Sequence, residues 1–302
     1  MEIWKLVSLY SRVSPDIVHQ VALIPVFYGS IAAIITKVPK IVNAVSGLGW
    51  LFTSTGILAG AIRLLFIPLF SHLLSNPRSK NIVQNPEDGS LLVAAGVPQN
   101  SLTLIRGAGV DINKFIPSVK KLDTVNVVMV SRMLWAKGVH EFMLAAKILM
   151  NENIDARFIL VGGIDLGNPT SVPIKELESW SKRDGFEWWG KRSDIPEVLR
   201  DADILCLPSY YGEGVPKVLL EGAAAGLPLI TTNTPGCKEV VQDGFNGILI
   251  PPRDENALAK SIRKLVMHKN LRELMGSNGR EKAIREFSDE LIIGQTLLLY
   301  TK

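Results

Sequence analysis

From residue 123 to residue 267 the sequence alternates between short apolar runs and segments in which apolar residues recur at helical spacing. The continuous β-branched run TVNVVMV is typical of a buried parallel strand. Similar runs follow in ARFILVGG, EWWG, ADILCLPS, LPLITTN and GILIPP, and we expect helices over 175–183, 194–200, 217–225 and 255–267. Strands that alternate with helices in this way predict an α/β fold with a doubly wound parallel sheet. Ligands of such a sheet lie beyond the carboxyl ends of its strands.

The first hundred residues follow the same plan less clearly. SPDIVHQ predicts a strand that ends at His19, KIVNAVSGLG a strand that ends in a glycine loop, and NIVQNPED a strand that leads into a helix. A chain of 302 residues is long enough for two domains. The hydrophobic content of 47% is sufficient for two real cores.

Charge is distributed unevenly along the chain. Residues 1–120 carry ten Lys or Arg and five Asp or Glu, although the whole chain has a net charge of only +4. A basic and strongly apolar first half favours a partner that is both anionic and apolar, such as a membrane surface. Nucleic acid is disfavoured, because basic residues neither form runs nor alternate with aromatic residues. The two cysteines, Cys206 and Cys237, form neither a disulfide framework nor a metal cluster with histidine, which favours a reducing compartment.

The segment GILAGAIRLLFIPLFSHLL, residues 56–74, is the strongest candidate for membrane contact. Arg63, Pro68 and His72 argue against a spanning helix. We expect either an interfacial amphipathic helix or a buried helix that caps a cleft. The first ten residues contain Glu2 and Lys5 and lack the apolar core of a secretory signal.

The segment YYGEGVPKVLLEGAAAG, residues 210–226, places two acids, Glu213 and Glu221, eight positions apart. Pro216 restricts Val215 to extended geometry and suits the first turn of a helix, so we expect a helix from Lys217 onward. Eight helical steps cover about 12 Å, which is comparable with the distance from the sugar to the ribose of a nucleotide sugar. The free amides at the start of the helix favour an anion such as a diphosphate.

The sequence from residue 205 to residue 254 resembles the retaining GT-B glycosyltransferases of family 4 almost continuously. The resemblance implies that Glu213 contacts the donor sugar and that Glu221 contacts the ribose hydroxyls. It implies a GT-B fold, in which two Rossmann-like domains face a cleft. The domains expected from it are 1–118 on the acceptor side, 119–286 on the nucleotide-sugar side, and a helix over 287–302 that returns to the first domain. The donor-binding segment would be Gly214, Val215, Pro216 and Lys217.

Two cations follow the strand VNVVMV in the order SRMLWAKG. Arg132 and Lys137 suit the diphosphate of a donor, arginine through its fork and lysine as a point charge. The resemblance is close here as well, and it implies that both residues neutralise the leaving nucleoside diphosphate. We therefore expect a reaction that needs neither a metal nor a cofactor. Asp201 and Asp203 resemble a metal-binding Asp-x-Asp only superficially, and we interpret them as helix-end and strand-edge residues.

Gly163 and its neighbour Gly162 follow the strand FILV and are expected to let the backbone approach the nucleotide closely. The loop 191–194 matches the family's loop that borders the base, which makes Arg192 a donor-binding candidate. Asp194 in this loop is equally well explained as the N-cap of the following helix.

On the acceptor side, Ser46 and Gly47 follow a predicted strand of the first domain. Many relatives carry a histidine near this loop, and Ser46 occupies the matching place, so His19 is the remaining candidate. GLGWLFTST resembles a subgroup that builds bacterial surface polysaccharides on polyprenyl diphosphate carriers. This implies a lipid-linked saccharide acceptor and a cytoplasmic, peripheral location on the inner face of the plasma membrane.

The sequence departs from the family at its beginning. Relatives usually begin with a strand and a glycine-rich loop, whereas this chain opens on the helix-like stretch IWKLVSLYSRV. We therefore expect a first domain that lacks its initial part. Either the chain is truncated at its N-terminus, which we favour, or it is a variant that works without that loop. Our leading interpretation is a hexosyltransferase-type enzyme of O-antigen, capsule or lipopolysaccharide biosynthesis. The alternative is a catalytically inactive protein that binds nucleotide sugars, and donor turnover measured beside nucleotide binding would separate the two.

Overall fold

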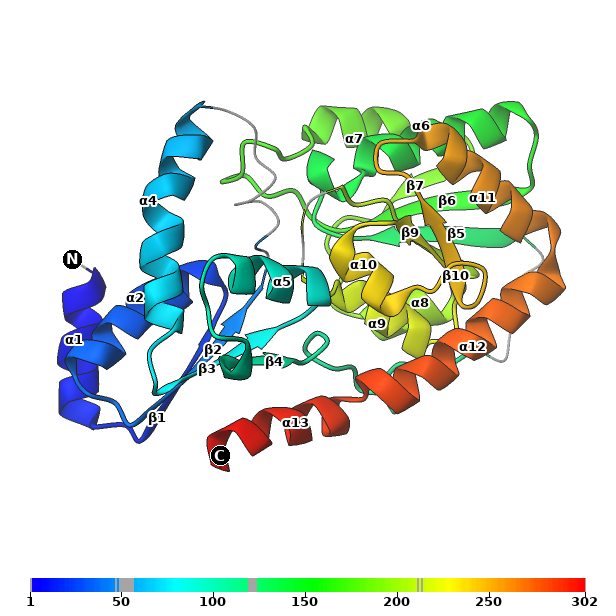
Figure 1. Ribbon diagram of the computed structural model, residues 1–302. Helices are drawn as coiled ribbons and strands as arrows, with labels where there is room; N and C mark the ends of the chain where they lie inside the picture. Colours follow the sequence, from blue (N-terminus) through cyan, green and yellow to red (C-terminus); the bar gives the residue numbers. More distant parts are fainter. Residues whose placement is uncertain are drawn as a thin grey trace. The chain divides into compact units, whose positions relative to one another are not determined.

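The computed structural model describes residues 2–46, 48, 57–118, 124–210, 212 and 214–301, and of residues 57–65 it describes the backbone. The chain forms two compact units (Figure 1). The first contains Met1–Gly107, Gly212–Val215 and Glu290–Lys302, and the second contains Ala108–Tyr211 and Pro216–Asp289.

The second unit is built on a six-stranded parallel sheet in the order β10-β9-β8-β5-β6-β7. The strands are β5 (Val125–Val130), β6 (Ala156–Val161), β7 (Phe186–Trp188), β8 (Ile204–Leu207), β9 (Leu229–Thr232) and β10 (Gly247–Ile250). Renumbered within the unit, this is the Rossmann order 3-2-1-4-5-6, whose topological switch point lies between β5 and β8. The doubly wound parallel sheet predicted from the sequence is confirmed.

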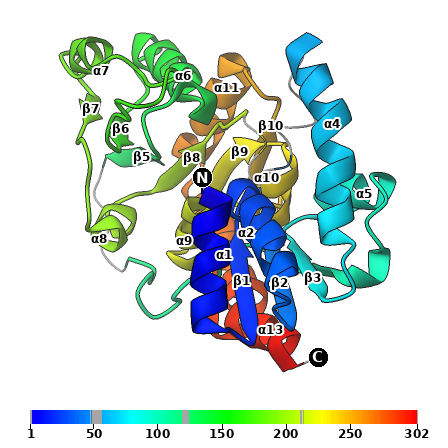
Figure 2. The ribbon, with the colours of Figure 1, turned by 90° about the vertical axis from the view of Figure 1, so that its left-hand side faces the viewer.

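Helices cover both faces of this sheet (Figures 1 and 2). They are α6 (Val139–Asn151), α7 (Ile174–Trp180), α8 (Ile195–Arg200), α9 (Lys217–Ala224), α10 (Pro235–Val240), α11 (Glu255–Met267) and α12 (Lys269–Phe287), with a short 3-10 helix, η2, at Trp135–Lys137. α6 packs beside α11, and α9 packs beside α12. In the core under α6, Phe142 packs against both Phe158 and Phe186, and all three side chains are fully buried.

The first unit contains a four-stranded parallel sheet in the order β1-β2-β3-β4. Its strands are β1 (Ile17–Val21), β2 (Lys40–Val45), β3 (Ser79–Val83) and β4 (Leu102–Leu104), and its helices are α1 (Glu2–Val13), α2 (Leu23–Ile35), α4 (Ile57–Leu74), α5 (Pro86–Ala94), the short η1 (Gln99–Ser101) and α13 (Asp289–Thr301). α13 contributes Ile292 and Leu299 to a core with Val42 and Ile82. The prediction that the first strand ends at His19 is wrong, because β1 continues for two residues and pairs with β2 as far as Val21.

Buried amides fix the register of the three longer strands in the first unit. Gln20, Asn43 and Asn81 occupy matching positions on β1, β2 and β3. Asn43 Nδ2 donates to Asn81 Oδ1 at 3.0 Å, and Ser30 Oγ on α2 donates to Asn43 Oδ1 at 3.2 Å. Register matters strongly here because Asn43 and Asn81 are buried, and a shift by one residue would separate their side chains. The residues that follow β2 and β3 therefore emerge next to each other.

One face of the second half of α4 packs into the core of the first unit. Phe70 and Leu74 pack with Val45 and Leu48 in one core, and Phe66 packs against that core. This supports the buried-helix interpretation for that half of the segment. Among the helices that the structure describes, none is long and apolar enough to cross a membrane.

Candidate functional site

A cavity of about 460 Å³ opens at the carboxyl ends of β5 and β6, beside the switch point of the second unit. Three segments line it: the residues after β5, the residues after β6, and the loop that leads into α8. The lining residues are Val130, Ser131, Arg132, Val161, Gly162, Gly163, Ile164, Asp165, Leu166, Lys191, Arg192 and Ile195. Three of the predicted site residues, Arg132, Gly163 and Arg192, are thus brought to one place.

Gly162 allows β5 and β6 to end so close together. Its φ is +150°, and a Cβ atom at this position would lie 1.7 Å from the carbonyl oxygen of Ser131. Its N–H donates to Gly190 O at 2.8 Å, and its carbonyl accepts from Trp188 Nε1 at 2.9 Å. The glycine loop is therefore held on both sides, and its bare backbone forms part of the cavity wall.

The cavity carries more positive than negative charge. Arg132, Lys191 and Arg192 line it together with one carboxylate, that of Asp165. Arg132 Nη1 lies 2.8 Å from Asp165 Oδ2. Cations and exposed backbone at the ends of parallel strands are the features that bind a diphosphate in nucleotide sites.

Arg192 is engaged by Asp194 through two nitrogens. Arg192 Nε donates to Asp194 Oδ1 at 2.7 Å, and Nη2 forms a second, shorter contact with Oδ2. The hydrogen bond from Arg192 lowers the pKa of Asp194 to about 2. Asp194 is the N-cap residue of α8, as one of the two interpretations expected, but its side chain binds Arg192 and makes no capping hydrogen bond with the helix. The Arg192 guanidinium also lies 5.5 Å from the ring of Trp189.

The predicted helix after the acidic motif is present as α9. Pro216 is its N-cap residue, with extended backbone, and no side chain caps the helix. Glu221 lies half-buried on α9, and burial raises the pKa of its carboxyl, while the charges of Lys217 and Lys114 oppose that rise. Glu213 and Gly47 lie outside the described residues. Pro216, Lys217 and Glu221 do not line the cavity at the ends of β5 and β6.

Gly214 and Val215 belong to the first unit, where a residue absent from the predictions contacts them. Gln84, directly after β3, accepts a hydrogen bond from Val215 N–H through Oε1 at 2.8 Å. A Cβ atom on Gly214 would lie 1.9 Å from the same oxygen and 3.4 Å from Ser46 Cβ. The amide of Val215, which we expected to face an anion, is therefore bonded to Gln84 here.

The remaining predicted residues are not among those that line the cavity. Lys137 is the last residue of η2 and is not among the lining residues. His19 Nδ1 lies 2.6 Å from the hydroxyl of Tyr300 on α13, and burial lowers the pKa of the imidazole. His19 and Tyr300 both belong to the first unit.

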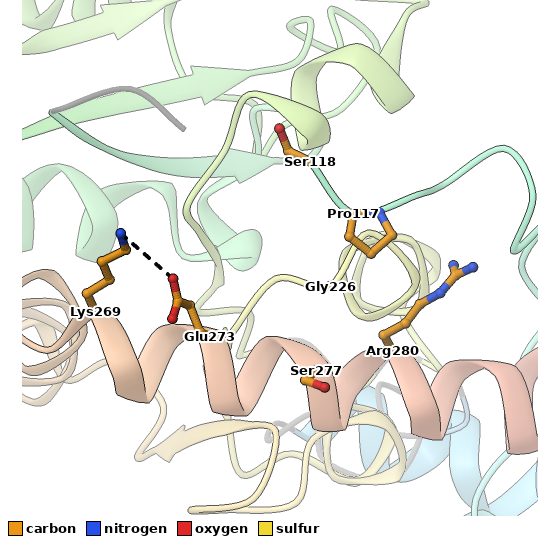
Figure 3. A pocket seen from close by; sticks show the side chains of 7 residues that line it. All are labelled: Pro117, Ser118, Gly226, Lys269, Glu273, Ser277 and Arg280. Carbon is orange, nitrogen blue, oxygen red and sulfur yellow. Dashed lines mark ion pairs between the residues drawn. The ribbon is translucent and has the colours of Figure 1, made fainter. Parts of the chain in front are cut away.

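A second cavity, of about 530 Å³, lies beside α12 in the second unit (Figure 3). Lys269 and Glu273 form an ion pair there at 3.9 Å. Arg280 donates to the carbonyls of Phe115 and Ala224, each at 2.7 Å. None of the residues predicted for the site lines this cavity, and Arg280 is already satisfied by backbone.

Within the part of the chain that the structure describes, no three His, Cys, Asp or Glu side chains come together as a metal site. The carboxylate of Asp203 accepts from Asn126 N–H at 3.0 Å, and Asp201 follows α8. Both aspartates therefore have the helix-end and strand-edge positions expected of them. Cys206 and Cys237 are buried free thiols, and burial raises the pKa of Cys206.

Two units built on parallel sheets, with a cation-lined cavity beside the switch point of the second, match the GT-B plan that the sequence resemblance implied. Residues 111–282 match the family described as glycosyl transferases group 1, and residues 1–85 match the one described as glycosyl transferase 4-like. The first match covers more than half of the chain, which therefore belongs to the glycosyl transferases group 1. The prediction of a glycosyltransferase is confirmed.

Two relatives illustrate the relationship. The chain is 29% identical over 288 residues to N,N'-diacetylbacillosaminyl-diphospho-undecaprenol alpha-1,3-N-acetylgalactosaminyltransferase of Campylobacter jejuni, covering 91% of this chain and 74% of that protein. It is 28% identical over 299 residues to UDP-Gal:alpha-D-GlcNAc-diphosphoundecaprenol alpha-1,3-galactosyltransferase of Escherichia coli, covering 94% of this chain and 75% of that protein. This chain thus spans about three quarters of each relative.

A solved structure supports the fold. The crystal structure of Anabaena Alr3699/HepE in complex with UDP superposes with a TM-score of 0.83 at 21% identity, covering 99% of this chain and 81% of that chain. The GT-B prediction is confirmed by this likeness.

Proposed function

We propose that the protein transfers a sugar from a nucleotide-sugar donor to a saccharide carried on a polyprenyl diphosphate, as a step in bacterial O-antigen or capsule synthesis. The observation that carries the proposal is the cavity at the ends of β5 and β6, where Arg132 and Lys191 face a bare glycine backbone. The names of the Campylobacter and Escherichia relatives contain diphosphate-linked undecaprenol. These names support the same acceptor class for this chain.

The donor is proposed to bind with its diphosphate against the cations of the cavity. Arg132 and Lys191 offer N–H donors, and the loop at Gly163 lets phosphate oxygens approach the backbone. Glu221 is proposed to accept hydrogen bonds from the ribose hydroxyls, and Glu213 to contact the sugar. The structural neighbour that bound UDP supports this class of donor.

The reaction is proposed to proceed with retention and without a metal. As the bond between the sugar and the phosphate breaks, negative charge grows on the leaving diphosphate. Arg132, which lines the cavity, would stabilise that charge, and Lys137 at the end of η2 is proposed to do so from beyond the residues that line the cavity. The leaving phosphate lies on the face that the acceptor approaches, so it can take the proton of the acceptor hydroxyl. The chain therefore needs no general base, and Ser46 and His19 are proposed only as acceptor-side contacts.

The acceptor's lipid also favours a peripheral location on the inner face of the plasma membrane. The first 120 residues carry an excess of basic side chains, which attract anionic headgroups. Sedimentation with vesicles tests this, because binding is expected to anionic vesicles and to fall with salt. Equal sedimentation with zwitterionic vesicles would contradict an electrostatic contribution.

The transfer is tested with purified protein, a panel of nucleotide sugars and a synthetic polyprenyl-diphosphate-linked saccharide. We expect turnover of one donor, a product whose new linkage has the anomeric configuration of the donor, and a rate that EDTA leaves unchanged. An inverted linkage or a loss of rate in EDTA would contradict retention or metal independence. Nucleotide binding without turnover on any such acceptor would favour the inactive binding protein instead.

A further inference from the structure

The side chain of Arg132 is held by a carboxylate on the neighbouring loop of the cavity. Arg132 Nη1 and Asp165 Oδ2 are 2.8 Å apart, and the two side chains are 62% and 33% exposed. We propose that Asp165 is a positioning residue, which aims the guanidinium of Arg132 at the diphosphate. This inference rests on the proposed function, because it takes the diphosphate as the ligand of Arg132.

Asp165 can act in this way because its own loop is internally closed. Its N–H donates to Ser171 Oγ at 3.0 Å, and its carbonyl accepts from Asn168 N–H at 2.9 Å. Asn168 Oδ1 also accepts from Thr170 N–H at 3.0 Å. These bonds fix residues 165–171 as a turn, so the carboxylate projects from a defined backbone.

The turn is also tied to the segment that carries Arg132. Met133 N–H donates to Gly163 O, and Trp135 N–H donates to Thr170 O, both at 3.0 Å. Both bonds are made between backbone atoms, so they persist when the Asp165 side chain is changed. A substitution at this position therefore removes the side-chain contact and leaves the two loops joined.

The form of the ion pair favours positioning over blocking. Arg192 and Arg263 each bind their carboxylate partner through two nitrogens. Arg132, in contrast, contacts Asp165 through Nη1. Among the residues that the structure describes, none binds Nε or Nη2 of Arg132, so the arginine fork can bind a second anion through them while one N–H is held. A carboxylate that served to block Arg132 would be expected to bind two of its guanidinium nitrogens.

The benefit of such a contact lies in binding and catalysis more than in stability. A free arginine side chain loses rotamer freedom when it binds a ligand, whereas a pre-positioned one loses less. Exposed ion pairs contribute little to folding stability. We therefore expect variants at Asp165 to keep the melting temperature of the wild type and to lose rate.

Kinetics of Asp165→Ala and Asp165→Asn test the proposal. We expect Asp165→Ala to lower kcat by roughly 10- to 100-fold, because a misplaced catalytic group costs about that much. Asp165→Asn is expected to recover most of the rate, since its Oδ1 can accept the same N–H. In an Arg132→Ala background, Asp165→Ala should have no further effect. Glu152→Ala, which frees Arg263 from another exposed pair, is the matched control and should behave as wild type.

Binding distinguishes failure of this inference from failure of the proposed function. The affinity of the tightest-binding nucleotide among UDP, GDP, ADP and dTDP is compared with the affinity of its nucleoside. Asp165→Ala should reduce the difference between these two affinities. A wild-type protein that binds none of them and turns over no donor would overturn the proposed function, and the inference with it. If the wild type is active and Asp165→Ala has the same rate, only the inference is overturned. The same holds if Asp165→Ala lowers the rate by the same factor in the Arg132→Ala background. Tighter binding by both Asp165 variants would show a blocking carboxylate and overturn it as well.

Discussion

Gly162→Ala is expected to damage both the stability of the second unit and its nucleotide site. The new Cβ would lie 1.7 Å from Ser131 O and 2.9 Å from Met133 Cε. Since the nearest atom belongs to the backbone, no side-chain rotation relieves the overlap. The φ of +150° adds strain for any residue with a Cβ.

The size of the effect follows from these two terms. A non-glycine residue in a sparsely populated backbone region costs about 1–3 kcal/mol. Forcing packed neighbours apart costs about 1–3 kcal/mol more. We therefore expect a loss of roughly 2–6 kcal/mol in the free energy of unfolding, out of a typical total of about 5–15 kcal/mol.

Nucleotide binding should weaken together with the stability of the second unit. Ser131, the residue that must move, directly precedes Arg132, and the Gly162 carbonyl accepts the bond from Trp188. Urea unfolding, followed by tryptophan fluorescence, measures the stability, and calorimetric titration with a nucleoside diphosphate measures binding. The chain has two units, so the transition of the second unit must be fitted separately.

Two other glycines in this part of the chain are matched controls. Gly167→Ala places its Cβ where no heavy atom lies within 4 Å, and Gly163→Ala places it 3.3 Å from Lys191 Cβ. The expected order of damage is therefore Gly162, then Gly163, then Gly167. If Gly162→Ala unfolded and bound nucleotide as Gly167→Ala does, the argument from close backbone approach would be refuted.

Glu221→Ala should weaken nucleotide binding by about 1–3 kcal/mol through the loss of a charged hydrogen bond, and calorimetry that showed no change would remove Glu221 from the site. Because burial raises the pKa of Glu221 above its ordinary 4.5, wild-type affinity should fall as the pH drops through that raised pKa, whereas Glu221→Ala should show no such fall. Burial also raises the pKa of Glu141, so the folded state opposes its ionisation. Glu141→Gln should raise the melting temperature at neutral pH and lose this advantage in acid, and a gain that did not depend on pH would contradict the assigned cause. Arg280→Ala should lower the free energy of unfolding by about 2–4 kcal/mol, since it leaves three partly buried carbonyls without their charged donor. An unchanged urea midpoint would show that water replaces the guanidinium.

Much of the second unit could be predicted because its elements follow local rules. β5 is a continuous β-branched run, and α11 begins at the predicted residue because Asp254 accepts a hydrogen bond from Ala257 N–H at 2.8 Å. α9 begins at Lys217 as predicted, although Pro216 is its N-cap residue and not part of its first turn. In each case the deciding interaction lies within a few residues along the chain.

Other elements were missed because tertiary packing decides them. α2 is apolar along its length, and its N-cap residue, Ala22, forms no side-chain cap, so the sequence carries no start signal for it. α12 contains Gly276, which reads as a helix breaker, yet a Cβ at Gly276 would lie 2.0 Å from Gly226 O. The glycine is needed because α12 packs closely against the end of α9. Close packing of backbones cannot be recognised from either segment alone.

The contrast between local rules and tertiary packing also explains which functional residues could be predicted and which could not. Arg132 and Gly163 could be predicted because a residue just after a parallel strand must lie at the ligand-binding edge of the sheet. Gln84 could not, since it meets Val215 across 131 residues of sequence. Asp165 follows the predicted glycines by two positions, but its contact with Arg132 spans 33 residues and depends on the order of β5 and β6. A motif therefore identifies the groups that would meet the donor, whereas the residues that aim those groups are determined by which strand ends become neighbours.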